Sequence, residues 1–390
     1  MNRVAITGIG ALTPLGNTFK ESWQGLLDGR GGIDIYNDIL ETPYLSGRLK
    51  DYDPLKFMSF KEVQRLDPFA RYALSAAHMA VDDASLNSKL DNHTAVIIGS
   101  SRGGIMSMER SSKNDSKRPS PYLMPATTIS VAASYIAQTF KLTSHCLGIS
   151  NACSSGANAV GEAYRLIKHG YASSVICGGA DAPICRVCLM GYKSSHVMSM
   201  TKPSKPFDSY RDGFILSEGA CVMMLEELEQ AQSRGARIYA EIIGYVNSTD
   251  GFDPVKPDIN AQAKSMKTAL MSCGLATHDI DLINAHAAST KIGDQTEASA
   301  INQVFGAVRV TANKSATGHM LAASGAFEIA SSASSIKYSL IPPTINIKNI
   351  DPKCDINVIL RRISTPVKTA ISNSFGFGGL NAVIVLTNEV

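Results

Sequence analysis

Long apolar runs are missing from the 390-residue sequence, and no stretch reaches membrane-spanning length. The opening residues, MNRVAITGIG, contain one arginine but no extended apolar core and no cleavage site, so we expect no secretory signal. The chain also lacks a large excess of charge of one sign, since its net charge is only +3. This small charge argues against a nucleic-acid partner, although local basic patches stay possible. These absences predict a soluble, cytoplasmic protein without a membrane span.

Paired cysteine motifs are almost absent as well. The chain has eight cysteines, but Cys185 and Cys188 form its only CxxC pattern. No second CxxC or HxxxH follows, so zinc ligation is weakly indicated, and two small buried thiols are the expected alternative. We therefore predict no metal site and, in a reducing compartment, free thiols in place of a disulfide framework.

Low-complexity segments and long linkers are lacking too, and strand-like stretches alternate with helix-like ones. The short β-branched runs cover residues 2–10, 93–101, 173–181, 238–246, 283–287, 308–314, 367–375 and 382–387. Helical patterns cover residues 69–84, 158–170 and 260–274. This alternation predicts an α/β fold with mostly parallel, buried strands, although no internal sequence repeat is evident.

Two features of the pattern bear on organisation. A strand begins near 239–244, which predicts a division into residues 1–242 and 243–390. The segment GIGALTPLG resembles part of a dinucleotide fingerprint through Gly8 and Gly10, but Thr13 stands where a third glycine is required. We interpret these glycines as a tight strand-to-helix turn.

Cys153 occupies a distinctive local setting. The segment HCLGIS resembles a strand, and apolar residues recur at helical spacing behind NACSSG. Cys153 should therefore stand at or just before a helix N-terminus, where free N–H groups and the helix dipole favour the nucleophilic thiolate. A buried structural cysteine is the alternative.

Two histidines follow strand-like runs and are flanked by small residues: His286 in LINAHAAST and His319 in TANKSATGH. Because ligands of α/β sheets bind beyond the carboxyl ends of strands, these histidines predict a lined pocket. Glu328 lies in a nearly uncharged helical stretch, where a buried carboxylate needs a partner, and Lys314 or a histidine is the candidate.

A glycine-rich loop, SNSFGFGG, places Gly376 and Gly378 beside Phe375 and Phe377. Such a loop can bring backbone N–H groups to a ligand and move an aromatic ring over it. A plain glycine-rich hairpin is the alternative.

Taken together, NACSSG, NAHAAST, NKSATGH and SNSFGFGG resemble the β-ketoacyl-acyl carrier protein synthases, the condensing enzymes of fatty acid and polyketide synthesis. The resemblance covers nearly the whole chain. It implies the thiolase fold, with two similar α/β halves stacked as five layers (αβαβα). It also implies an acyltransferase that condenses malonyl-carrier protein with an acyl chain on Cys153, releasing CO2.

The resemblance assigns a role to each candidate residue. Cys153 carries the acyl thioester, His286 and His319 stabilise the enolate, and Lys314 with Glu328 holds that network. The N–H groups of Cys153 and Phe377 form the oxyanion hole, with Phe377 as a gate beside Phe375. The implied substrate contacts are Met108, Thr290, Gly376 and Gly378.

The resemblance further implies partners and no metal or redox cofactor, since the substrates arrive on the phosphopantetheine of an acyl carrier protein. The matching carrier-docking residues are Lys61, Arg65, Lys117, Arg118 and Lys205, with ordinary solvated charge as the alternative. The family forms dimers, so a homodimer and a heterodimer with a chain-length-factor-like homologue both stay open. A silent chain-length-factor-like subunit is the rival function, but such subunits lack the cysteine that this chain keeps.

The chain departs from the family pattern at three places, namely Ala287 and Ala288 for Gly-Thr, Asn151 for Thr, and Leu380 for Thr. Each change removes a hydroxyl or alters the backbone near the site. We interpret them as divergence toward a polyketide or polyene pathway. Initiating synthases and degradative thiolases fit less well, because the first use Asn in place of His319 and the second use another catalytic cysteine near the C-terminus.

Overall fold

The computed structural model describes residues 1–86, 90–113, 118–253 and 255–388. Within these ranges eleven strands form one mixed sheet in the order β12-β10-β9-β14-β15-β8-β1-β7-β6-β4-β5. The strands are β1 (Val4–Leu12), β4 (Ala95–Gly99), β5 (Cys146–Ile149), β6 (Ser174–Asp181), β7 (Gly219–Glu227), β8 (Ala240–Thr249), β9 (Leu282–Asn284), β10 (Arg309–Thr311), β12 (Asn357–Val358), β14 (Thr369–Gly376) and β15 (Leu380–Thr387).

The sheet repeats one strand order twice. β5-β4-β6-β7-β1 in the first half corresponds to β10-β9-β14-β15-β8 in the second, and β1 pairs with β8 to join them. In each half the first three of these strands run parallel and the last two pair antiparallel. The prediction of mostly parallel strands is therefore wrong. It overlooked β7, whose apolar run continues directly into a helical segment.

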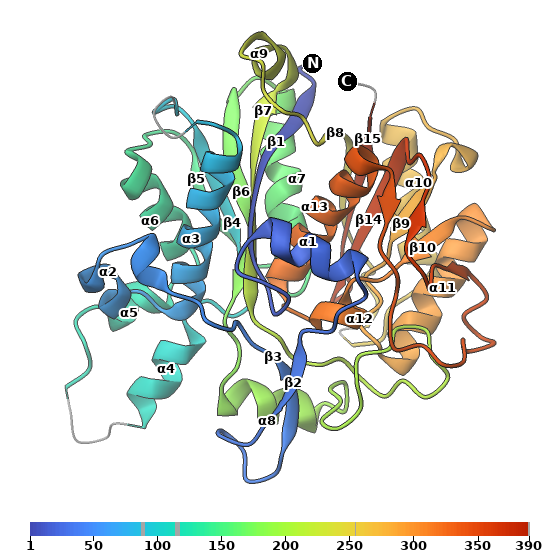
Figure 1. Cartoon of the computed structure of the whole chain (residues 1–390), viewed down its shortest axis with the longest axis horizontal. Helices are drawn as coiled ribbons and strands as arrows, with labels where there is room; N and C mark the ends of the chain where they lie inside the picture. The colour runs from blue at the N-terminus through green and yellow to red at the C-terminus, as the bar shows by residue number, and fades with distance from the viewer. Residues whose placement is uncertain (87–89, 114–117, 254, 389–390) are drawn as a thin grey trace.

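Helices separate and cover the two halves in layers, as Figure 1 shows. The outer layer on one side contains α3 (Pro68–Asp83) and α6 (Val131–Phe140), and that on the other contains α10 (Ile259–Ser272) and α11 (Lys291–Phe305). Between the halves lie α7 (Ser155–Lys168) and α13 (Ala322–Tyr338). The prediction of two similar α/β halves in five layers is confirmed, while the division at residues 242 and 243 stays a prediction.

The remaining helices and short strands lie outside the eleven-stranded sheet and the six helices named above. The helices are α1 (Phe19–Leu27), α2 (Phe60–Arg65), α4 (Ile105–Ser112), α5 (Leu123–Thr127), α8 (Arg186–Ser194), α9 (Leu228–Ser233) and α12 (Lys314–Thr317), with short turns η1 (Pro54–Lys56) and η2 (Thr277–Asp279). The short strands are β2 (Ile33–Tyr36), β3 (Tyr44–Gly47), β11 (Leu340–Ile341) and β13 (Ile363–Ser364). Among the helices described, none is long and apolar enough to cross a membrane.

Small residues allow the layers to approach closely. A Cβ atom on Gly156 of α7 would lie 2.0 Å from the Ala322 carbonyl oxygen, so the two central helices meet backbone to backbone. Gly8 and Gly10 lie inside β1, where a Cβ atom would collide with the Ala80 and Ala76 carbonyls of α3. Their interpretation as a strand-to-helix turn is wrong, because they serve helix-on-sheet packing instead.

The CxxC thiols are buried, as predicted, with Cys185 at the N-cap of α8 and Cys188 inside that helix. In the described part of the chain, no group of three or more histidine, cysteine or acidic side chains is placed to hold a metal ion.

Candidate active site

Cys153 stands between a strand and a helix. β5 ends at Ile149, Ala152 takes a left-handed conformation with φ of 46°, and α7 begins at Ser155. The N–H groups of Ser154 and Ser155 donate back to the Asn151 and Ala152 carbonyls at 3.1 and 3.2 Å. This tight turn confirms the predicted position of Cys153 just before a helix N-terminus.

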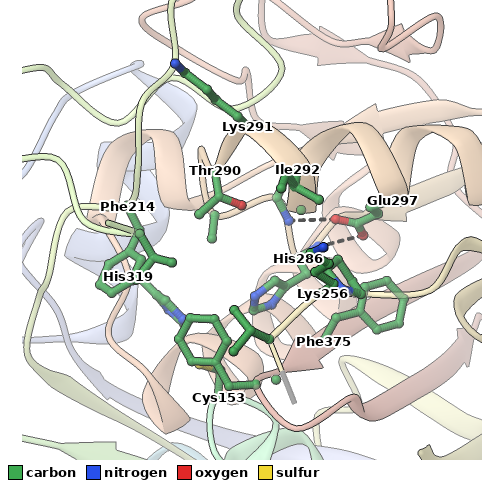
Figure 2. A pocket seen from close by; sticks show the side chains of 18 of the residues that line it. Cys153, Phe214, Lys256, His286, Thr290, Lys291, Ile292, Glu297, His319 and Phe375 are labelled. Atoms are coloured by element: carbon green, nitrogen blue, oxygen red, sulfur yellow. Dashed lines mark hydrogen bonds between the residues drawn. The ribbon is translucent and has the colours of Figure 1, made fainter. Parts of the chain in front are cut away.

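Cys153 opens into a cavity of about 380 Å³. Of the predicted residues, the lining includes Cys153, His286, Thr290, His319, Phe375, Gly376 and Phe377. Figure 2 shows the cysteine and both imidazoles directed into the same space, with Phe375 beside His286. The two imidazole rings meet edge to face, with centroids 5.4 Å apart. Chain segments that are far apart in sequence therefore meet at one site.

A buried cation lies directly behind His286. The Lys314 Nζ atom donates to the Glu328 carboxylate and, at 2.7 Å, to the His286 carbonyl. It also lies 3.4 Å from His286 Nδ1. An ammonium group has donors only, so Nδ1 accepts, and the proton of neutral His286 resides on Nε2. The expectation that Glu328 has a buried partner is met by Lys314.

His319 is held by a serine. Its Nδ1 atom lies 3.3 Å from Ser324 Oγ, which also accepts the Met320 N–H at 2.9 Å. The Nε2 atom of His319 is buried without a hydrogen-bond partner in the described part of the chain. This nitrogen is therefore available to a group that enters the cavity.

Both imidazoles are kept neutral. Burial lowers the pKa of His286 and of His319 well below the usual value, and the Lys314 charge lowers the pKa of both further. Each ring can therefore donate one N–H without carrying a net charge.

The thiol differs from the sequence-based expectation. Burial raises the pKa of Cys153 to about 11, although Lys314, Arg102 and a hydrogen bond from the Phe377 backbone all lower it in part. The prediction of a low-pKa thiolate is therefore wrong for the free protein, because desolvation outweighs the lowering by Lys314, Arg102 and the Phe377 N–H group.

The glycine-rich loop packs on the cysteine turn. A Cβ atom on Gly376 would lie 3.2 Å from the Asn151 carbonyl oxygen and from the Cys153 nitrogen. The Phe377 N–H points at the Cys153 sulfur. Two backbone N–H groups, of Cys153 and Phe377, thus lie close to the sulfur, as an oxyanion hole requires.

Sequence reasoning missed Glu297 on α11. Its carboxylate accepts hydrogen bonds from the backbone N–H groups of His286 and Ala287, at 2.9 and 2.7 Å. The side-chain amide of Asn373 also donates to it, at 3.1 Å. Figure 2 shows the two backbone contacts as dashed lines. The signal was an acidic residue among small ones, the same pattern that singled out Glu328.

The departures from the family pattern fall around the cavity. Ala287 holds a φ of 25°, in the left-handed region that favours glycine, and Ala288 lines the cavity without a hydroxyl. The Asn151 carbonyl accepts hydrogen bonds from Ser154, and Leu380 opens β15. Ala288 and Leu380 therefore offer no side-chain hydrogen bond there.

Several predicted residues lie away from the cavity. Met108 on α4 is 51% exposed and does not line it, and Gly378 takes a φ of 83° beside the lining. Lys61 and Arg118 are exposed, and Arg65 lies over the Tyr122 ring. Lys117 lies outside the described residues. The Lys205 side chain is only 13% exposed and faces Asp208, so it is the least available of the predicted docking cations.

Comparison with known proteins identifies the family of this chain. Family models described as "Beta-ketoacyl synthase, N-terminal domain" and "Beta-ketoacyl synthase, C-terminal domain" match residues 1–231 and 239–348. The proteins named 3-oxoacyl-[acyl-carrier-protein] synthase 2 from Synechocystis sp. and from Staphylococcus aureus are each 37% identical to this chain, over 98% of it and 97% of their own length.

Two solved structures are also similar over the whole chain. The first, titled "The ishigamide ketosynthase/chain length factor", superposes with a TM-score of 0.94 at 31% identity and covers 100% of both chains. The second is a type II PKS acyl-carrier protein in complex with its ketosynthase bound to the hexaketide, with a TM-score of 0.90 at 28% identity over 99% of each chain. The chain belongs to the β-ketoacyl synthase family and is an acyltransferase that performs elongating condensation in fatty acid or polyketide synthesis.

Proposed function

We propose that Cys153 accepts an acyl group from an acyl carrier protein and that His286 and His319 decarboxylate a malonyl thioester to extend it. The observation that carries this proposal is the meeting of one cysteine and two neutral imidazoles in a single cavity. The product is a β-ketoacyl thioester on the carrier, together with CO2.

In the first half-reaction the Cys153 sulfur attacks the acyl thioester carbonyl, and the carrier thiol leaves with the proton. The N–H groups of Cys153 and Phe377 stabilise the oxyanion, for which donors of this kind are worth about 10²–10³ in rate. Burial raises the pKa of the free thiol to about 11, so the thiol is protonated at pH 7 and its proton has to leave as the sulfur attacks.

In the second half-reaction a malonyl thioester takes the place of the acyl donor. The C–C bond to its carboxylate breaks, CO2 leaves, and negative charge collects on the thioester oxygen. The Nε2–H groups of His286 and His319 stabilise that oxygen. The resulting carbanion attacks the Cys153 thioester, and the cysteine leaves as a thiolate that takes up a proton.

Lys314 and Glu328 act through His286. The Lys314 charge keeps Nδ1 of His286 unprotonated and disfavours the imidazolium, while Glu328 neutralises the buried ammonium group. Glu297 fixes the backbone that bears His286. We assign these three as positioning residues.

We propose that the substrates arrive on phosphopantetheine, with Thr290 contacting the arm at the cavity mouth, and that no other cofactor takes part. We place the carrier protein against the exposed cations Lys61 and Arg118 and the half-buried Arg65, where opposite charge speeds and orients the encounter. A similar solved structure contains a ketosynthase with its acyl carrier protein, which supports this partner.

We also propose assembly through β5. This strand forms one edge of the sheet, and its side chains Cys146 and Leu147 are exposed. An uncovered apolar edge strand is a site for pairing with another chain. A second copy and a chain-length-factor-like homologue are the two candidate partners, and the ketosynthase/chain length factor structure favours testing the second.

The roles can be separated by measuring two products. Wild-type protein given acyl- and malonyl-carrier should release CO2 and form a β-ketoacyl carrier. His286→Ala and His319→Ala should retain Cys153 acylation but each lose CO2 release by about 10²–10³. If either variant released CO2 at the wild-type rate, the assignment of that histidine would be wrong.

A further inference from the structure

A second recess, of about 230 Å³, lies between α2, α4, α5 and the start of α3. Four arginines line it, namely Arg65, Arg71, Arg110 and Arg118. None of the lining residues that the structure describes is acidic. The recess therefore gathers the positive charge of several arginines, and it is separate from the Cys153 cavity.

The four guanidinium groups form no ion pair with a carboxylate within the described ranges. Two acids act on these arginines. Asp67, beside Arg71, is fully buried, and its two oxygens accept the Phe69 and Ser107 N–H groups at 3.2 and 2.7 Å. Glu62 interacts with Arg65, whose charge helps to lower the pKa of Glu62. Asp67 therefore offsets the charge of Arg71 only in part, and the recess keeps an excess of positive charge.

Two of the four arginines have contacts that hold them in place, and one of these two is repelled by a third. Arg71 Nε donates to the Leu66 carbonyl at 2.8 Å, and the Arg65 guanidinium lies 4.5 Å from the Tyr122 ring centroid. Burial lowers the pKa of Arg71, and the neighbouring Arg110 charge lowers it further. Gathering like charges at fixed positions is unfavourable unless an anion binds between them.

We propose that this recess binds the phosphate group of a small molecule. Guanidinium groups pair with phosphate oxygens through parallel hydrogen bonds, and the lining also carries the hydroxyl groups of Ser107, Ser111 and Ser120. A concave recess of this size suits a compact anion better than the surface of a folded partner.

This inference goes beyond the proposed function, but the two share Arg65 and Arg118. An anion in the recess would neutralise part of the surface at which the carrier protein docks. A phosphate-bearing metabolite would therefore lower the rate of carrier encounter without entering the Cys153 cavity. The recess then acts as a point of inhibition by small phosphorylated molecules.

The test is calorimetric titration of the full chain with orthophosphate, pyrophosphate and adenosine monophosphate at constant ionic strength. Saturable binding is expected. Arg110→Gln should weaken it at least about tenfold, because one charge-assisted contact to the phosphate group is lost. Arg110 is exposed, so this variant should fold normally. Arg71→Gln is a second variant in which the affinity for phosphate should fall. Comparing the three probes separates free phosphate from a phosphomonoester.

The matched controls are Arg110→Lys, which keeps the charge and should retain part of the affinity, and Lys264→Gln on α10, which should bind as wild type does. Absence of saturable binding, or equal loss in Lys264→Gln, would overturn the proposal. If Arg110→Gln raised only the KM for carrier protein, the recess would belong to protein docking and the phosphate proposal would be wrong. Binding is read without turnover, so failure of the proposed reaction would not affect this result.

Discussion

Among single residues, Lys314 is a positively charged side chain that is fully buried, between Glu328 and His286. Removing its charge leaves Glu328 as a buried, unpaired carboxylate, which costs about 3–5 kcal/mol. Lys314→Met should therefore lower the free energy of unfolding in urea by that amount. It should also reduce CO2 release about a hundredfold, the loss expected when His286 no longer donates to the developing oxyanion.

The double variant Lys314→Met with Glu328→Leu is the control. With both charges gone, most of the lost stability should return, while CO2 release should stay low because His286 still lacks its cation. A double variant that is as unstable as the single one would show that the buried ion pair does not cause the loss.

The Cys153 thiol provides a prediction about pH. Its pKa is raised to about 11 by burial, so the neutral thiol dominates at pH 7 and the thiolate fraction grows as the pH rises toward 11. Alkylation of Cys153 by iodoacetamide should rise about tenfold per pH unit between pH 7 and 10. Peptide mass spectrometry after timed labelling measures this rate, and a plateau below pH 8 would contradict the raised pKa.

At the residue scale, sequence reasoning reached Cys153, His286, His319 and the Lys314–Glu328 pair, since each stands in a distinctive local pattern. It could not reach the sign of the Cys153 pKa shift. That sign depends on the competition between desolvation and the nearby Lys314 and Arg102 charges, and burial is decided by packing across the whole fold.

Among the elements, the contact between α7 and α13 positions the turn of Cys153 against that of His319. A methyl group on Gly156 would lie 2.0 Å from the Ala322 carbonyl oxygen. Gly156→Ala should therefore lower the free energy of unfolding by about 1–3 kcal/mol through overpacking, despite the better helix propensity of alanine. Thermal unfolding should show a lower Tm together with weaker condensation.

Gly191 on α8 supplies the matched helix position, because no atom lies within 4 Å of a Cβ built there. Gly191→Ala should leave the Tm unchanged or raise it slightly. Equal losses in the two variants would refute the close helix contact as the cause.

The sequence predicted where most of the main strands lie, but it did not predict which strands pair with each other. Short β-branched runs predicted β1, β4, β6 and β8 within a few residues. β7 was missed, and Gly8 and Gly10 were misassigned, because helix-on-sheet contacts across many residues of chain leave no local signature.

For the whole molecule, the exposed edge strand β5 predicts self-association or pairing with a homologue. Leu147 is 48% exposed there. Leu147→Lys should weaken assembly at least tenfold in analytical ultracentrifugation, since lysine on an edge strand opposes pairing. Leu360, 47% exposed elsewhere, is the matched control, and Leu360→Lys should assemble normally. Equal assembly in both variants would contradict the β5 interface.

The repeated strand order was also hidden from the sequence. Its two halves share a topology but no evident sequence repeat, since the same buried positions are satisfied by many apolar residues. The resemblance of whole motifs, and not their periodicity, gave the five-layer arrangement. We retain residues 1–242 and 243–390 as the proposed halves.

The central claim is that Cys153 carries the growing acyl chain. Intact-mass spectrometry of the full chain after incubation with acyl-carrier proteins of several chain lengths tests it most directly. The account predicts a mass increase of one acyl group on the wild-type protein, located at Cys153, and no increase on Cys153→Ala. Failure of every donor to acylate the wild type, or equal acylation of Cys153→Ala, would contradict it.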